Sequence, residues 1–163
     1  MQWFKSTRTD DAVRPLADRH YNRQTPGARG FAPPGRCLVL KTQACDAFWI
    51  TSWPYAQYVK HAWPGAWICS AFRNEGPLLS SFLIHEALQA THAYYGAPPA
   101  IGIVTFVDPT KTKRKRDPGR CFRKAGFHPA GKTVGGLVAL WMPPWEVPAA
   151  TPAIGALPWK PAT

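Results

Sequence analysis

The clearest change of hydrophobic period in the chain lies between residues 66 and 96. Residues 66–72 form a short apolar run after the Pro64 and Gly65 turn, a pattern typical of a buried strand. From Leu79 onward the apolar positions recur at helical spacing, and Gly96 follows the last of them. The pattern therefore predicts a strand, a glycine-containing loop and a helix in succession.

Alternating positions and turn signals predict further strands on both sides of this unit. The expected strands cover residues 37–41 and 47–53, which form a hairpin, and then residues 101–107, 130–133 and 137–142. Helical spacing predicts one helix over residues 10–24, with Asp10 or Asp11 as its N-cap, and a short one that follows Asp117 and Pro118 and ends at Ala125. The first nine residues fit an edge strand or an extended arm.

The length and composition of the chain fit one domain. A chain of 163 residues buries roughly two thirds of its unfolded surface without disulfides or metals. We expect this domain to span residues 1–148. Residues 149–163 are rich in Pro and Ala and are expected to be flexible or laid on the surface.

Two segments between the expected elements carry residues that suit nucleic acid. Residues 25–36 contain three prolines and three glycines, and their Arg29, Arg36 and Phe31 fit contacts to a phosphate backbone and a base. Residues 53–67 contain five Trp and Tyr side chains. These either cover an edge of the sheet or form a stacking surface for a flipped or single-stranded base.

The charge balance favours a polyanionic partner. Lys and Arg number 20 against 9 Asp and Glu, giving a formal net charge of +11, so nucleic acid is the leading candidate. The densest basic run holds Lys113, Arg114, Lys115 and Arg116, which we expect to contact the DNA backbone. A generic solvated loop is the alternative.

Metal, disulfide and membrane chemistry find no support in the sequence. The four cysteines show no C-x-x-C spacing, and Gln89 stands where a zinc-binding H-E-x-x-H motif starting at His85 needs its second histidine. No uninterrupted apolar run approaches the roughly 20 residues that span a bilayer. We therefore expect a soluble, cytoplasmic protein with no metal and no membrane partner.

The loop between the central strand and helix is a candidate anion site. It contains Arg73, Asn74, Glu75, Gly76, Pro77 and Leu78. Its glycine allows backbone amides to approach a ligand where a helix N-terminus carries partial positive charge, which suits a pyrophosphate. An ordinary connecting turn is the alternative.

Further along the chain a basic helix ends in Gly126 and Phe127, with a strand between the two motifs. This order resembles the GNAT superfamily of acyl-CoA-dependent N-acyltransferases, in which an Arg/Gln-x-x-Gly-x-Gly/Ala loop holds the CoA pyrophosphate. The resemblance implies a single α/β domain with a mixed, mostly antiparallel sheet flanked by helices. It implies acetyl-CoA as co-substrate, bound by residues 73–78 and Phe122. Leu78 departs from the small residue of the motif, and Phe122 stands where many members carry a tyrosine general acid.

Three short sequence motifs resemble those of a narrower, phage-associated branch of that superfamily. They are Arg19-His20-Tyr21-Asn22-Arg23, Pro33-Pro34-Gly35-Arg36 and Phe106-Val107-Asp108-Pro109. The branch includes Mom-like DNA-modification proteins and the acetyltransferases of thymidine hypermodification. The resemblance implies N-acetylation of 5-aminomethyl-deoxyuridine in phage DNA, inside the host cytoplasm, which protects the genome from restriction. The alternatives are Mom-like adenine modification and a non-catalytic basic DNA-binding module.

Acyl transfer to an amine needs a free amine and a polarised thioester carbonyl. Asp108 follows the strand over residues 101–107, at the sheet edge where such sites form, and is the first candidate for a general base or amine-positioning group. His20, Tyr21 and Ser70 are further catalytic candidates. Because Phe122 cannot donate a proton, another group or water must protonate the leaving thiolate.

Overall fold

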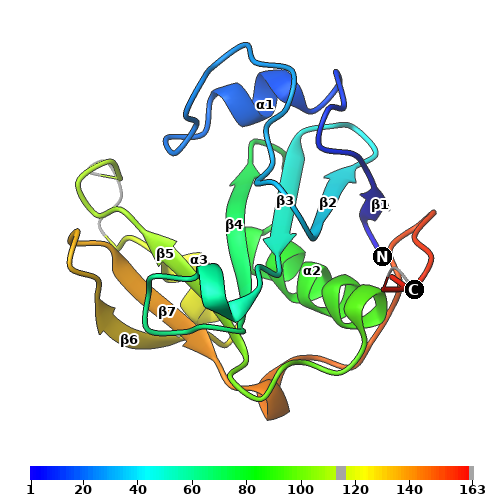
Figure 1. Ribbon diagram of the computed structural model, residues 1–163. Coiled ribbons are helices and arrows are strands. Elements are labelled where there is room, and N and C mark those ends of the chain that lie inside the picture. The colour runs from blue at the N-terminus through cyan, green and yellow to red at the C-terminus, as the bar shows by residue number, and fades with distance from the viewer. Residues whose placement is uncertain (113–116, 162–163) are drawn as a thin grey trace.

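A seven-stranded sheet in the order β1-β2-β3-β4-β5-β7-β6 forms the centre of the molecule (Figure 1). The computed structural model describes residues 1–112 and 117–161. The strands are β1 (Trp3–Lys5), β2 (Cys37–Thr42), β3 (Ala47–Ser52), β4 (Trp67–Asn74), β5 (Ile103–Val107), β6 (His128–Lys132) and β7 (Val138–Met142). Among the strand pairs of the described residues, β4 and β5 alone run parallel. The expected α/β class with a mostly antiparallel sheet is therefore confirmed.

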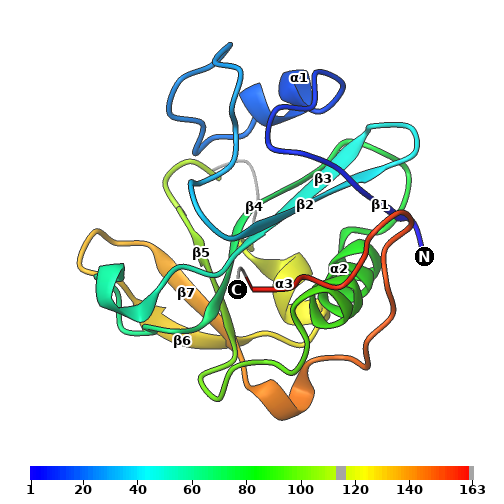
Figure 2. The same cartoon turned by 45° about the vertical axis from the view of Figure 1, so that its right-hand side comes forward.

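The helices cover both faces of the sheet and are few (Figure 2). They are α1 (Arg14–Asp18), α2 (Ser80–Tyr95) and α3 (Arg120–Lys124), with single 3-10 turns η1 (Ala56–Tyr58) and η2 (Pro144–Glu146). The long helix α2 lies on one face together with α3, and the short α1 lies on the other. The fold is thus one strongly twisted sheet between an extensive helical layer and a thin one.

Strand β3 is buried along its whole length because both of its faces are covered. On the α2 side, Trp49 packs in the cluster that also holds Trp3 and Trp67, and the Trp3 Nε1 donates to the Leu83 carbonyl at 2.8 Å. On the α1 side, Phe48 and its neighbours receive the apolar residues of α1. The large apolar area buried on each face makes β3 the strand that fixes the two layers together.

The first helix is much shorter than the expected span of residues 10–24. It begins after Val13, so neither Asp10 nor Asp11 is its N-cap. Asp10 instead accepts hydrogen bonds from Ser6 Oγ and Lys41 Nζ. After Asp18 the chain turns toward the sheet, where Asn22 Nδ2 donates to the Ser70 carbonyl of β4. Likewise, Gly119 and not Asp117 is the N-cap of α3.

The C-terminal segment lies along the surface of the domain. Ile154 forms a bridge with Phe4 of β1, and Thr151 N donates to the Gln89 carbonyl of α2 at 3.1 Å. Further on, Trp159 N donates to the Tyr94 carbonyl, and its ring lies 5.9 Å from that of Tyr95. These contacts cover the edge strand β1 and the end of α2, which protects an otherwise unpaired sheet edge.

Gly102 offers a test of the close approach between β5 and β7. Its φ is +78°, and an added Cβ would collide with the Met142 carbonyl oxygen, whereas Gly131 has φ +91° with open space around it. We expect Gly131→Ala to lower the free energy of unfolding by about 1 kcal/mol, from backbone strain alone. Gly102→Ala should lower it by about 3 kcal/mol or more. Urea denaturation measures both, and equal losses would contradict the close packing at residue 102.

Candidate functional site

The parallel strands β4 and β5 pair over three residues and then separate. Trp67, Ile68 and Cys69 face Ile103, Val104 and Thr105, but β4 continues to Asn74 with no further pairing to β5. On its other edge β4 has a bulge, since Ile50 of β3 faces Ala71 while the next residue faces Cys69. Ser70 is therefore the extra residue. A bulge bends its strand and increases its twist, which turns the end of β4 away from β5.

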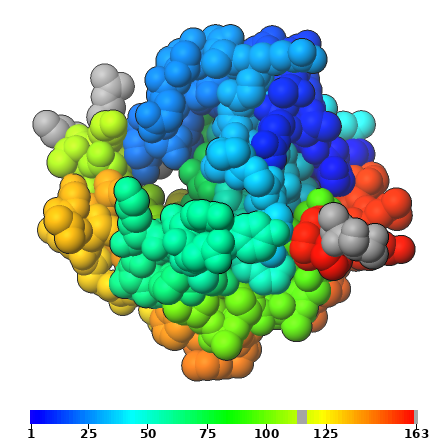
Figure 3. Space-filling model, in the orientation of Figure 1, coloured from blue at the N-terminus to red at the C-terminus, as the bar shows by residue number. Residues whose placement is uncertain are grey.

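The separation opens a cavity of about 670 Å³, which we call the wedge cleft. Figure 3 shows the surface hollowed between the N-terminal segment in blue, the segment around η1 in teal and the end of β5 in yellow-green. Residues of both helical layers line it: Arg19, His20, Tyr21 and Asn22 from the α1 side, and Ser80 and Phe122 from the α2 and α3 side. The wedge cleft therefore reaches from one face of the sheet to the other.

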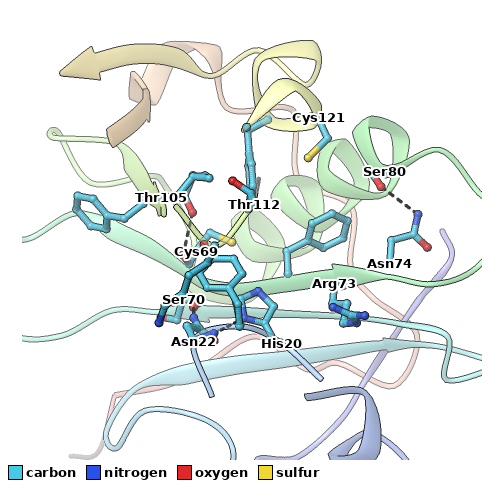
Figure 4. A pocket seen from close by; sticks show the side chains of 18 of the residues that line it. His20, Asn22, Cys69, Ser70, Arg73, Asn74, Ser80, Thr105, Thr112 and Cys121 are labelled. Atoms are coloured by element: carbon cyan, nitrogen blue, oxygen red, sulfur yellow. Dashed lines mark hydrogen bonds between the residues drawn. The ribbon is translucent and has the colours of Figure 1, made fainter. Parts of the chain in front are cut away.

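Polar side chains gather where β4 carries its bulge. Figure 4 shows His20 and Asn22 beside Ser70, with Thr112 and Cys121 across the cavity. Asn22 Nδ2 donates to the Ser70 carbonyl at 2.9 Å, and the Ser70 hydroxyl lies 2.6 Å from that of Ser52. These bonds fix the bulge and aim a set of hydrogen-bonding groups into the middle of the wedge cleft.

His20 is buried and tightly oriented. Its ring stacks on Tyr21 with centroids 4.7 Å apart, and its Nδ1 accepts the Asn22 backbone N–H at 3.2 Å. Because Nδ1 is an acceptor, the neutral ring carries its proton on Nε2. In this tautomer the N–H of His20 is on Nε2, so the ring suits polarisation of a carbonyl better than removal of a proton.

Tyr21 links two of the sequence motifs that lie far apart in the chain. The Asp108 backbone N–H donates to the Tyr21 hydroxyl at 3.3 Å. The Asp108 carboxylate accepts hydrogen bonds from Thr110 Oγ1 at 2.6 Å and Thr110 N at 2.9 Å, which hold the pKa of Asp108 below its ordinary value. Burial raises the pKa of Tyr21 and keeps its phenol neutral. Asp108 does not line the wedge cleft, but Thr110, which donates to its carboxylate, does.

The glycine loop of residues 73–78 meets the wedge cleft only at its first two residues, Arg73 and Asn74. The Gly76 amide donates to Asn74 Oδ1 at 2.9 Å, and an added Cβ there would collide with the Asp46 carboxylate. The glycine is therefore required for packing against the β2–β3 turn, and its amide is already engaged. Glu75, Pro77 and Leu78 also lie away from the lining.

The Gly76 amide is bonded to Asn74, but the N-terminus of α2 has backbone N–H groups that could bind an anion. No side chain caps the helix, and among the described residues no backbone acceptor meets the amides of Ser80, Ser81 and Phe82. Unpaired amides and the helix dipole together attract an anion. Ser80 lines the wedge cleft, so this positive end opens into it.

Arg73 takes part in an ion-pair network beside the wedge cleft. Glu75 accepts two hydrogen bonds from Arg19, each at 2.9 Å, and another from Arg73 Nε. Arg73 also donates to the Arg19 carbonyl at 3.0 Å. The hydrogen bonds from Arg19 and then Arg73 lower the pKa of Glu75 to about 2. The network ties the end of α1 to β4 and so fixes one wall of the wedge cleft.

The residues that we expected to contact nucleic acid do not form one group. Arg29 is exposed on the loop that follows α1. The Arg36 guanidinium instead lies over the rings of Trp53 and Tyr55, with distances to the ring centroids of 4.6 and 4.3 Å. Trp67, from the same aromatic segment, is a core residue. Lys113, Arg114, Lys115 and Arg116 lie outside the described residues.

Several lining residues had no place among the sequence candidates, and three of them are polar residues with a clear position in the fold. Asn22 belongs to one of the quoted motifs, yet its contact with the bulge of β4 depends on the early end of α1. Thr105 follows from strand alternation, and its Oγ1 donates to the Cys69 carbonyl at 3.1 Å where the two strands separate. Ser80 is signalled only by its position at the helix start.

In comparisons with known proteins, no family model, no curated protein and no solved structure matches the chain. Within residues 1–112 and 117–161 no helix is both long and apolar enough to cross a membrane. In the same residues no three His, Cys, Asp or Glu side chains gather as a metal site would need. The wedge cleft is therefore the basis for a functional argument.

The ion-pair network predicts how stability depends on pH. The pKa of Glu75 falls from 4.5 to about 2 on folding, so its stabilising effect is complete above pH 4.5 and disappears as the pH drops toward 2. Glu75→Gln should lower the free energy of unfolding by about 1 kcal/mol or less at pH 7, because the pair is exposed. Urea denaturation should show this difference vanish in acid. The control Asp11→Asn removes a single exposed ion pair and should give a smaller difference at pH 7.

Proposed function

We propose that this protein is an acyl-CoA-dependent N-acyltransferase that acetylates an amine carried by a base in DNA. One observation carries the proposal: β4 and β5 separate beside the open N-terminus of α2, and the resulting cleft crosses the sheet. A two-substrate transfer needs such a passage, because donor and acceptor must meet without occupying the same volume. The likeness of the sequence to the GNAT superfamily supports the same conclusion.

The α2 side of the wedge cleft suits the donor. The amides of Ser80 and Ser81 at the helix start provide a site for a pyrophosphate. The pantetheine arm of CoA carries two amides, and the unpaired edge of β4 beyond Cys69 offers backbone groups of the kind that pair with an extended amide chain. Phe122 lines this side and packs against Phe72, giving the arm an apolar wall.

The reaction joins the amine nitrogen to the acetyl carbon and breaks the bond from that carbon to sulfur. The ammonium form must first lose a proton to water or a carboxylate, and the departing thiolate must gain one. Asp108, whose pKa is lowered by its hydrogen bonds from Thr110, lies beside a residue of the cleft lining and is suited to hold the ammonium group. His20, through Nε2–H, and backbone amides of β4 are suited to polarise the carbonyl.

The charge of the chain and the quoted motifs favour DNA as the bearer of the amine. An aliphatic amine such as that of 5-aminomethyl-deoxyuridine has a pKa near that of lysine and is a strong nucleophile once deprotonated. The exocyclic amine of adenine is a much weaker nucleophile, so its acylation would require stronger activation by the site. We therefore rank 5-aminomethyl-deoxyuridine first, with Mom-like adenine modification second and a non-catalytic DNA-binding module third.

Donor binding is tested at Ser80. Ser80→Glu places a carboxylate at the end of α2, where the helix dipole tolerates it but where it repels a pyrophosphate. Isothermal titration with acetyl-CoA should show at least about tenfold weaker binding than for Ser80→Gln, which has the same length and no charge. Equal affinities for the two variants would place the pyrophosphate elsewhere, and no binding by the wild-type protein would favour the non-catalytic module.

The acceptor and the role of Asp108 are tested by mass spectrometry of nucleosides after incubation with acetyl-CoA. Aminomethyl-deoxyuridine in DNA should be acetylated, whereas modification of ordinary adenine instead would reverse our ranking. Asp108→Asn keeps the oxygen that accepts from Thr110 but loses the charge. Its turnover should fall by roughly tenfold to hundredfold at pH 7 and recover in part near pH 9.5, where more of the amine is free. An unchanged pH profile would remove Asp108 from the mechanism.

A further inference from the structure

A second cavity lies next to the wedge cleft, beneath the loop that follows α1. Its volume is about 510 Å³, and residues 22–34 form one wall while β3 and β4 form the other. We call it the loop slot. Figures 1 and 2 show this loop, in blue, standing over the ends of β3 and β4 on the face opposite α2. The loop slot is thus on the side of the sheet away from the proposed donor site.

The two cavities meet at a shared boundary. His20, Asn22, Ser70 and Ala71 line both of them. This boundary coincides with the bulge of β4, where Asn22 is bonded to the Ser70 carbonyl. A molecule in the loop slot would therefore meet a molecule in the wedge cleft at the group of polar side chains already proposed for the reaction.

The walls of the loop slot suit a flat, uncharged ring. Phe31 and Pro33 lie on the loop side, over a floor formed by Phe48 and Ile50, which are themselves buried in the core. Phe31 and Phe48 contact each other edge to face, with centroids 6.4 Å apart. Phe48 thus supports Phe31 from below, and the half-buried ring of Phe31 is the one on which a base would stack.

The polar groups of the loop slot point to a neutral ring with hydrogen-bonding edges. Asn22, Gln24 and Thr25 supply amide and hydroxyl groups, and no carboxylate is present among its described lining residues. A pyrimidine needs only the donors and acceptors that amides and hydroxyls provide.

The loop slot is held open by one buried arginine. Arg23 donates through Nε to Asp18 at 2.8 Å, and its two terminal nitrogens donate to the carbonyls of Gly30 and Ala28 at 3.0 and 2.7 Å. All three guanidinium nitrogens of Arg23 are therefore engaged in holding the loop, and the group is not directed at a ligand. A loop fixed in this way forms its cavity before the ligand arrives, which lowers the entropic cost of binding.

We infer that the loop slot binds the acceptor base, flipped out of the DNA, and presents its amine to the boundary formed by His20 and Ser70. The inference rests on the proposed function for the transfer step, but base binding itself needs no donor. Exposed Arg29, on the same loop, is placed to contact the phosphate next to the flipped nucleotide. The segment around η1 with its exposed Tyr58 then has no part in holding the base.

Photocrosslinking locates the base directly. A single-stranded oligonucleotide with one 5-iodo-deoxyuridine, irradiated with the full-length protein in the absence of acetyl-CoA, should crosslink to residues 22–34. Peptide mass spectrometry identifies the site. A crosslink to residues 53–67, or no crosslink at all, would overturn the inference.

Variants measure the contribution of the ring contact. Fluorescence anisotropy with an oligonucleotide containing one 5-aminomethyl-deoxyuridine should show about tenfold weaker binding for Phe31→Ala. Phe31→Trp keeps an aromatic wall and should restore affinity, which separates stacking from loss of folding. Tyr58→Ala, an exposed aromatic truncation, should bind as wild type does. Weakening by Tyr58→Ala but not by Phe31→Ala would place the base on the η1 segment.

The two proposals fail in different ways. If Phe31→Ala weakens oligonucleotide binding but the wild-type protein binds no acetyl-CoA, the loop slot stands and the acyl transfer falls. If Ser80→Glu weakens acetyl-CoA binding while Phe31→Ala leaves oligonucleotide affinity unchanged, the transfer stands and the loop slot falls. Acetylation of protein lysines in place of DNA would also overturn the assignment of a base to this cavity.

Discussion

The separation of β4 from β5 after the Cys69 and Thr105 pair is the feature on which the rest of the structure depends. A parallel pair that continued to the ends of both strands would close the sheet and leave no passage between its faces. The bulge at Ser70 gives β4 the bend that this separation requires. It also exposes the backbone of β4 to the wedge cleft, where backbone groups without strand partners are available to a ligand.

The two faces of the sheet differ in chemical character. The long helix α2 brings uncapped amides to one mouth of the wedge cleft, which favours an anion. The short helix α1 ends early and releases a loop that builds an apolar slot on the opposite face. Under the proposed function, the donor and the acceptor would bind on opposite faces of the sheet, and their reacting atoms would meet at the bulge.

The charged groups near the wedge cleft mainly hold elements of the fold together. Arg19, Glu75 and Arg73 tie α1 to β4, and Arg23 shapes the loop with all three of its guanidinium nitrogens. Arg36 stacks on aromatic rings away from the cavity. Among the described residues these arginines therefore have structural partners, and the net charge of +11 would act on a polyanion mainly through its long-range field.

The sequence by itself determined the strands of the β2–β3 hairpin, β4, α2 and the α/β class, because their hydrophobic periods are strong and local. It also singled out His20, Tyr21 and Ser70, which tertiary structure brings to one cavity. Only the tertiary structure decided the role of Gly76, since its neighbour Asp46 comes from another turn. It also decided the path of the chain after α1, since Arg19 and Asn22 bond to Glu75 and Ser70, which are far away in the sequence. The loop slot likewise depends on contacts between residues far apart in the chain, which no local pattern records.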